Sequence, residues 1–228
     1  MNLVFIEAKN NNTSEYNFIK TVLTNFFADK NIEFVCMNGV DNLFNQTIVN
    51  RIRQAQDENN KVLVLVDADW PSKGWGYAKR HNCVENKMAE LQISFPFFIY
   101  PNNSDDGDVE VLMETLVCKD LYKDWWDCFE DYEKCVQGAT DSEKKQKYNL
   151  PNRKAKLHTF ISSQQLSNKQ RDKIGRGFWL FDDPNYWDFT REELKPLLDF
   201  FKEHLQYFAS GDLIVICGMD VSWHLNDA

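Results

Sequence analysis

The sequence feature that most constrains the fold is a run of five aliphatic residues at positions 62–66, Val-Leu-Val-Leu-Val. A strand with one face in solvent alternates apolar and polar residues. A run without a polar face is typical of a strand covered by helices on both faces of a parallel sheet. Asp67-Ala68-Asp69 follows the run directly. The feature therefore predicts an α/β fold with acidic side chains at the carboxyl end of an inner strand.

The rest of the first half repeats the alternation of strands and helices. Further strands are expected at residues 3–6, 32–37 and 95–100. A helix capped by Thr13 or Ser14 follows the first of them, Asn38-Gly39 marks a turn after the second, and a helix over about 78–91 follows the central strand. This order predicts a three-layer α/β domain with a mainly parallel, four-stranded sheet.

The second half lacks strand signals and is mainly helical. Residues 154–164 and 192–206 have helical spacing, the latter with Leu194, Leu197 and Phe201 on one apolar stripe. We therefore divide the chain into an α/β domain at 1–118, a mainly helical extension packed on it at 119–206, and a tail at 207–228. The tail contains a strand-like run, 213–217, which the pattern does not place.

Composition narrows the class of protein. The 228 residues are 43% hydrophobic and 27% charged, as in a globular protein with a real core. The formal net charge of -9 argues against a broad basic face for nucleic acid, but it is compatible with carboxylate clusters that hold divalent cations. No run approaches the roughly 20 apolar residues that a membrane span needs, and no secretion signal is visible.

Several standard sites are missing from the sequence. None of the six cysteines forms a CxxC pair, so the simplest interpretation is reduced thiols in the cytoplasm. His81 and Cys83 alone are too few ligands to indicate a metal site. There is no P-loop and no GxGxxG fingerprint, and His158 has no nearby partner for a nucleophilic triad.

Carboxylates at strand ends are the strongest functional signal. Glu7 closes the first strand, and Asp67 and Asp69 close the central one. Parallel strands present their carboxyl ends at one edge of the sheet, and residues i and i+2 can point the same way, so we expect the three acids to share a cation. Mg²⁺ or Mn²⁺ suits such oxygen ligands. The alternative is ordinary capping, since Asp is common where strands end.

Other charged residues near this edge are secondary candidates. The loop after the fourth strand, 101–108, leads into Asp108 and Glu110, which could be further ligands or could simply favour a helix start. We interpret Asp105 and Asp106 as ordinary loop residues. Lys73, followed by Lys79 and Arg80, could neutralise a phosphate, although surface lysines beside acids are common.

The helical half offers weaker indications of nucleic-acid binding. Its basic residues cluster at 144–156, which could follow a phosphate backbone, but a solvated helix face is the preferred interpretation. Its tryptophans, among them Trp125, Trp126, Trp179 and Trp187, could stack on bases but more commonly would pack in a core.

These motifs together resemble the Toprim domain of topoisomerases, primases and OLD-family nucleases. Glu7-Ala8-Lys9, followed by Glu15 and Phe18, is similar to the family's Glu-Gly-Lys opening, and Asp67-x-Asp69 is similar to its acidic pair. An uncharacterised group of bacterial Toprim-like proteins is similar at residues 98–103 with 107–112, and at 186–188 with 194–197. The resemblance covers about residues 1–206 and implies a Toprim/Rossmann-like fold. It also implies that Glu7 is the general acid or base and that Asp67 and Asp69 hold Mg²⁺.

Two departures limit what the resemblance implies. Ala8 replaces the usual Gly and could restrict the approach of a phosphate to the backbone. The chain has no tyrosine nucleophile domain, primase zinc module or ATPase domain, so strand passage and priming are not expected.

The leading hypothesis is a Mg²⁺-dependent, Toprim-like protein that acts on phosphodiesters or nucleotides. Within this class we favour a nuclease, whose binding partner would be nucleic acid or a nucleotide. Two alternatives stay open. One is a nucleotide-sugar transferase that uses the Asp-x-Asp pair, where Glu7 has no role. The other is a Toprim-fold binding module without turnover, which the net acidity and Ala8 favour.

Overall fold

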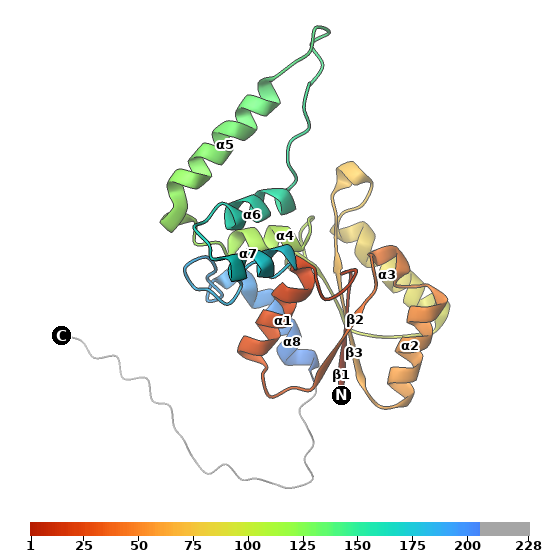
Figure 1. Ribbon diagram of the computed structural model, residues 1–228. Helices are drawn as coiled ribbons and strands as arrows, with labels where there is room; N and C mark the ends of the chain where they lie inside the picture. Colours follow the sequence, from red (N-terminus) through yellow and green to blue (C-terminus); the bar gives the residue numbers. More distant parts are fainter. Residues whose placement is uncertain (206–228) are drawn as a thin grey trace, which may run out of the picture.

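The computed structural model describes residues 1–205, which form an α/β fold on one four-stranded sheet (Figure 1). The strands are β1 (Asn2–Ile6), β2 (Ile32–Cys36), β3 (Lys61–Asp67) and β4 (Phe97–Tyr100). All neighbouring strands are parallel, and their order is β2-β1-β3-β4. The predicted fold class and its parallel sheet are therefore confirmed. The predicted tail at 207–228, with its strand-like run, lies outside the described residues.

The two inner strands are buried along almost their whole length, as the aliphatic run predicts. β1 lies between β2 and β3, and β3 lies between β1 and β4. Successive side chains of a strand point to opposite faces. Leu3 and Phe5 accordingly contribute to the core on one face, whereas Val4 and Ile6 contribute to the core on the other.

Two helices cover the first face of the sheet. They are α2 (Gln46–Asp57) and α3 (Tyr77–Leu91), drawn at the right of Figure 1. α2 begins at Asn45, whose side chain accepts a hydrogen bond from the amide of Ile48, and it buries Ile48, Val49 and Ile52 against the sheet. α3 is mostly exposed and buries Val84 and Arg80.

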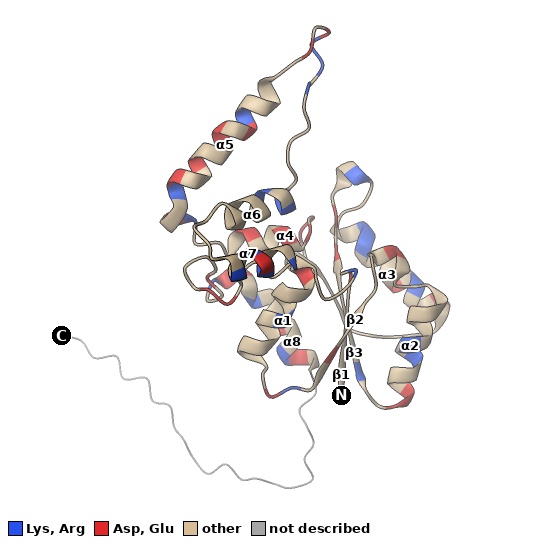
Figure 2. Cartoon of the chain, viewed as in Figure 1, with Lys and Arg blue, Asp and Glu red and all other residues tan. Residues whose placement is uncertain are grey.

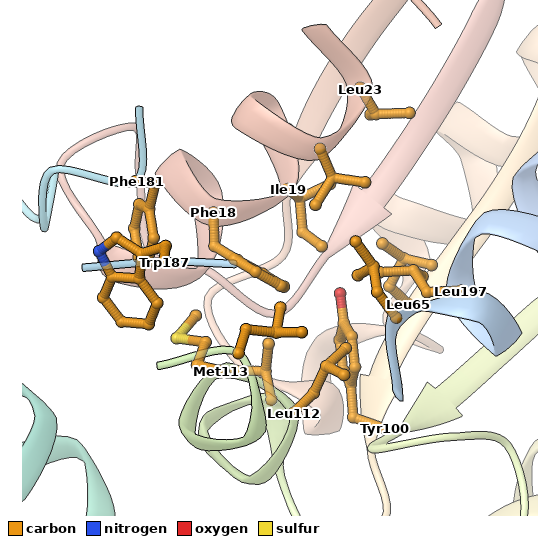
Figure 3. Close-up of a cluster of buried hydrophobic side chains, with 14 of the residues drawn as sticks. Phe18, Ile19, Leu23, Leu65, Tyr100, Leu112, Met113, Phe181, Trp187 and Leu197 are labelled. Atoms are coloured by element: carbon orange, nitrogen blue, oxygen red, sulfur yellow. The ribbon is translucent and has the colours of Figure 1, made fainter. Parts of the chain in front are cut away.

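The opposite face is covered by helices from both halves of the chain. They are α1 (Ser14–Phe26), α4 (Val109–Thr115), α6 (Arg153–Ser162), α7 (Asn168–Gly175) and α8 (Lys195–His204). Figure 3 shows the core that they share, in which Phe18 of α1 and Tyr100 of β4 lie with Phe181 and Trp187. The indole nitrogen of Trp187 donates to the carbonyl of Trp179 at 2.8 Å. The residues after 118 thus belong to the same core as the sheet.

One helix extends away from this body. α5 (Lys123–Gly138) projects outward in Figure 1, and the loop after it returns the chain to α6. Trp126 is the residue that α5 buries, where its ring packs with Phe160 at a centroid distance of 5.4 Å. Within residues 1–205, no helix is both long and apolar enough to pass through a lipid bilayer.

The helical half differs in detail from its sequence pattern. α8 is shorter than the stretch expected at 192–206, because a 3₁₀ turn at Glu192–Leu194 precedes it and Pro196 lies in its first turn, where proline is tolerated. α7 was not expected. It buries only Ile174, so its apolar periodicity is weak. The Ser167–Gln170 capping box that begins it is the signal that would have identified it.

Candidate functional site

Two of the predicted acids meet at the carboxyl ends of β1 and β3. Glu7 follows β1, and Asp67 is the last residue of β3. The backbone amide of Asp67 donates a hydrogen bond to Glu7 Oε1 at 2.7 Å, which joins the two strand ends directly. This contact follows from the parallel pairing of the two strands, which places both ends at one edge of the sheet.

The carboxyl group of Glu7 has an ionisation suited to proton transfer near neutral pH. Burial raises its pKa to about 7, while the hydrogen bond from Asp67 and the charge of Arg80 oppose that rise. A carboxyl group with a pKa close to the working pH can both release and accept a proton. The position of Glu7 between the ends of β1 and β3 fixes the orientation of its carboxyl group.

Asp67 is held from the opposite side by α4. Its Oδ1 accepts a hydrogen bond from the backbone amide of Val109, the first residue of α4, at 2.9 Å. The positive end of the helix dipole favours a carboxylate there. Burial nevertheless raises the pKa of Asp67 well above its ordinary value, and the charges of Glu7, Glu15 and Glu110 raise it further. Asp67 therefore lies in a site that has an excess of buried acids.

Asp69 has different partners. Its Oδ2 lies 3.0 Å from Arg80 Nη2, and its Oδ1 lies 3.2 Å from Lys73 Nζ. Arg80 is 3% exposed, and its Nε also donates to the carbonyl of Asp67 at 2.9 Å. Its guanidinium stacks on Trp75 at 3.9 Å from the ring centroid. The predicted acidic pair is thus bridged by one buried arginine.

The backbone explains why the two aspartates have separate contacts. The strand ends at Asp67, and Asp69 has a φ of 59°, in the left-handed region. Asp69 instead exchanges backbone hydrogen bonds of 2.6 and 3.0 Å with Gly107 in the loop after β4. Residues i and i+2 share a face only along an extended strand. The expected common direction of Asp67 and Asp69 therefore does not hold.

Two further buried acids lie beside Glu7 and Asp67. Glu15, in the first turn of α1, accepts a hydrogen bond from the backbone amide of Glu7 at 3.0 Å. Burial and the charge of Glu7 raise the pKa of Glu15 to about 8. Glu110 is 7% exposed and follows Val109 in the first turn of α4. We call Glu7, Glu15, Asp67 and Glu110 the carboxylate cluster.

A buried tyrosine lies close to the carboxylate cluster. Tyr100, the last residue of β4, is fully buried, and its hydroxyl has no hydrogen-bond partner among the described residues. Burial raises its pKa well above the ordinary value, and the charges of Glu15 and Asp67 add to the rise. Tyr100 therefore keeps its proton and can act only as a neutral hydroxyl.

The helical half supplies cations to this edge. Lys154 Nζ of α6 lies 3.0 Å from Glu110 Oε1. Its neighbour Arg153 donates from Nε to Glu114 Oε2 at 2.7 Å, and its Nη1 lies 3.8 Å from Asp108 Oδ1. Figure 2 shows basic residues at the start of α6. Sequence reasoning assigned this stretch to a solvated helix face, because the pattern alone could not show that α6 packs on α4.

The remaining candidates have simpler positions. Asp108 caps α4, since its Oδ1 accepts from the amide of Val111 at 3.1 Å. Asp106 accepts a hydrogen bond at 2.7 Å from the backbone amide of Tyr77, the first residue of α3, while Asp105 is exposed in its loop. Lys9 is exposed two residues beyond Glu7.

The described residues do not contain a preassembled metal site. Within residues 1–205, no three side chains of His, Cys, Asp or Glu are grouped so that they could hold a metal ion. The donors at this edge are nevertheless all carboxylate oxygens, which is the chemistry that Mg²⁺ and Mn²⁺ prefer. A cation here would have to replace Arg80 and Lys73 as the partner of Asp69.

Glu15 and Arg80 are the site residues whose importance was least evident from the sequence. Glu15 lies eight positions after Glu7 and is indicated in the sequence only by the resemblance to the Toprim opening, because an acidic residue in the first turn of a helix is common and the local pattern does not mark it as buried. Arg80 appeared only as one of several cations that could neutralise a phosphate. Its buried contact with both aspartates depends on how α3 packs on the sheet.

Comparison with protein families matches residues 1–206 to the family described as "Protein of unknown function (DUF3226)". No curated protein and no solved structure matches the chain.

Proposed function

For this chain, which belongs to the DUF3226 family, we propose a Mg²⁺-dependent, Toprim-like activity on phosphodiester or nucleotide substrates, specifically that of a nuclease. The observation that carries the proposal is the direct contact between Glu7 and Asp67, the last residue of β3, with Asp69 in the turn that follows. An acid with a pKa near 7 beside two further carboxylates supplies both a proton-transfer group and metal ligands. The proposed compartment is the cytoplasm, in keeping with the spacing of the cysteines.

The excess of acidic groups at the site favours the binding of a divalent cation. Burial disfavours the charged forms of Glu7, Glu15 and Asp67 and raises the pKa of each, and the charges of neighbouring acids raise these pKa values further. A metal ion bound by Asp67 and Asp69 would offset this repulsion, and when bound it would polarise a phosphate oxygen and help to generate a nucleophile.

The protein's own residues have separate roles in this proposal. Glu7 holds or accepts a proton at Oε1, the atom that also accepts the hydrogen bond from Asp67. Before a metal binds, Arg80 keeps the two aspartates oriented through its bonds to the Asp67 carbonyl and the Asp69 carboxylate. Lys73 is 62% exposed beside Asp69, so its ammonium can reach a phosphate from solvent.

A binding module without turnover is the second candidate. The ion pairs of Asp69 with Arg80 and Lys73 favour it, because they neutralise the carboxylate that a metal would need. Such a module would recognise a nucleotide or nucleic acid at the same edge without hydrolysing it. The transferase alternative gives Glu7 no role, although Glu7 is the residue that connects the two strand ends.

Metal binding and hydrolysis together test these proposals. Isothermal titration calorimetry with Mn²⁺ should show binding to the wild type and its loss in Asp67→Asn/Asp69→Asn. Asp105→Asn is the matched control, because Asp105 is an exposed acid in the neighbouring loop. Equal affinities in the wild type and the double variant would refute the metal site.

Nuclease assays on single- and double-stranded DNA and RNA, with and without Mn²⁺, then distinguish catalysis from binding. We expect cleavage that requires the metal and falls by about 10²–10⁴-fold in Glu7→Gln, the range typical of a general acid or base. Tight binding without cleavage would support the binding module instead. Activity that survives in Glu7→Gln would exclude the proposed proton-transfer role.

A further inference from the structure

Lys154 lies beside the proposed site but has no role in the proposed activity as described above. We propose that Lys154 is a substrate-binding residue of this site and that its ammonium group contacts a phosphate of a bound nucleic-acid strand. The inference rests on the proposed function and deepens it, because it assigns part of substrate recognition to the helical half of the chain.

The position of Lys154 is fixed by packing. It lies in the first turn of α6, which is capped by Asn152 and buries Leu157, Phe160 and Ile161 in the shared core. α6 also packs directly on α4, the helix that begins at the carboxylate cluster. A cation carried by a packed helix is held more precisely than one on a loop.

Lys154 lies between the carboxylate cluster and solvent. Its Nζ is 3.0 Å from Glu110 Oε1, and its charge also acts on Glu15 and Asp67. The side chain of Lys154 is 54% exposed, whereas that of Glu110 is 9% exposed. The ammonium group can therefore face the acids and an incoming ligand at the same time.

The electrostatics of the edge require such a cation. A phosphate that approaches a group of carboxylates is repelled unless positive charge lies between them. Lys73 and Arg80 provide that charge beside Asp69, and Lys154 provides it on the side of Glu110. A lysine ammonium is a compact charge with three donors and is a common ligand for phosphate.

The attachment of α6 to the rest of the molecule does not require a lysine at position 154. Arg153 already connects α6 to α4 through its bond of 2.7 Å with Glu114, and the apolar side chains of α6 are buried. Lys154 neutralises the buried acid Glu110, and its side chain is 54% exposed, so the ammonium group still has donors for a ligand that approaches from solvent.

The test compares binding of a fluorescent single-stranded oligothymidylate, and of its duplex with oligoadenylate, by fluorescence anisotropy with Ca²⁺ in place of Mg²⁺, so that an oxygen-ligated cation is present while cleavage is avoided. Lys154→Gln should weaken binding about tenfold, the loss expected for one charged contact, whereas Lys154→Arg should stay close to the wild type. Lys156→Gln is the matched control, since Lys156 lies on the same helix but pairs with Glu133. Mn²⁺ calorimetry on the same variants should show that Lys154→Gln still binds the metal.

The outcomes separate the two proposals. If the wild type binds DNA and Lys154→Gln binds it equally well, the role of Lys154 is excluded and the proposed function stands. If Lys154→Gln loses Mn²⁺ binding together with DNA binding, Lys154 maintains the site rather than contacting phosphate, which also overturns the inference. If the wild type binds neither DNA form, the inference is overturned, while the proposed function is decided separately by the cleavage assays on DNA and RNA.

Discussion

At the scale of single residues, Arg80 determines how the predicted acidic pair can be used. Its guanidinium is buried, bonds to both aspartates and stacks on Trp75. Removing one partner of a buried pair leaves an uncompensated charge, so Arg80 and Asp69 stabilise each other. A divalent cation must compete with this arginine for the carboxylate of Asp69. The proposed nuclease requires the cation to win this competition, whereas the binding module does not.

The buried acids predict a dependence of stability on pH. The pKa of Glu7 is raised to about 7 and that of Glu15 to about 8, both from 4.5. Between about pH 4.5 and 8 the folded state therefore binds more protons than the unfolded state, so the free energy of unfolding falls as pH rises. The slope reaches at most about 1.4 kcal/mol per pH unit for each proton. Urea denaturation at pH 5.5, 7 and 8.5 in the presence of a chelator should show this decline.

A neutral isostere isolates the contribution of one acid. Glu15→Gln should reduce the decline between pH 5.5 and 8.5, because the amide cannot ionise. Glu193→Gln, which changes an exposed acid in the 3₁₀ turn before α8, should leave the decline unchanged. A stability that is independent of pH in the wild type would contradict the burial of these acids.

At the scale of elements, the sequence identified what depends on local pattern and missed what depends on packing. The aliphatic run at 62–66 gave β3 within one residue at each end, because a strand without a polar face has few alternatives. The turn at Asp69 was missed, because its left-handed backbone depends on the bonds with Gly107. α7 was missed because only Ile174 is buried.

One glycine fixes the position of α1, the helix that carries Glu15. Gly177 has a φ of +77°, and a Cβ atom there would lie 2.4 Å from the backbone carbonyl carbon of Thr13, the residue that caps α1. Asn17 of α1 also donates to the carbonyl of Arg176 at 3.3 Å. The segment after α7 therefore contacts the beginning of α1 too closely for any side chain.

Replacing this glycine should be costly. Gly177→Ala combines a clash with backbone, about 1–3 kcal/mol, and a left-handed conformation, about 1–2 kcal/mol, so we expect a loss of about 2–5 kcal/mol in the free energy of unfolding. Gly175→Ala is the control, because a Cβ atom there meets nothing within 4 Å. Urea denaturation of both variants measures the difference. Similar stabilities for the two would show that the contact with Thr13 is not close.

At the scale of the whole molecule, the division of the chain at residue 118 does not divide its core. Phe18 of α1 packs on Phe181 with ring centroids 5.6 Å apart, and Phe98 of β4 packs on Phe200 of α8 at the same distance. The sequence indicated that the second half is helical, but the partners of its apolar faces could not be derived from periodicity. Which helix covers which face is a property of the assembled molecule.

A shared core predicts that the two halves unfold together. Phe181 is 1% exposed and contacts Phe18, Trp179 and Trp187, so Phe181→Ala should lower the free energy of unfolding by about 3–5 kcal/mol. Far-ultraviolet circular dichroism, which follows helices throughout the chain, and tryptophan fluorescence should give coincident unfolding curves before and after the substitution. Phe26→Ala, at a 44% exposed position of α1, should cost much less. Two separate transitions would mean that the helical half folds independently of the sheet.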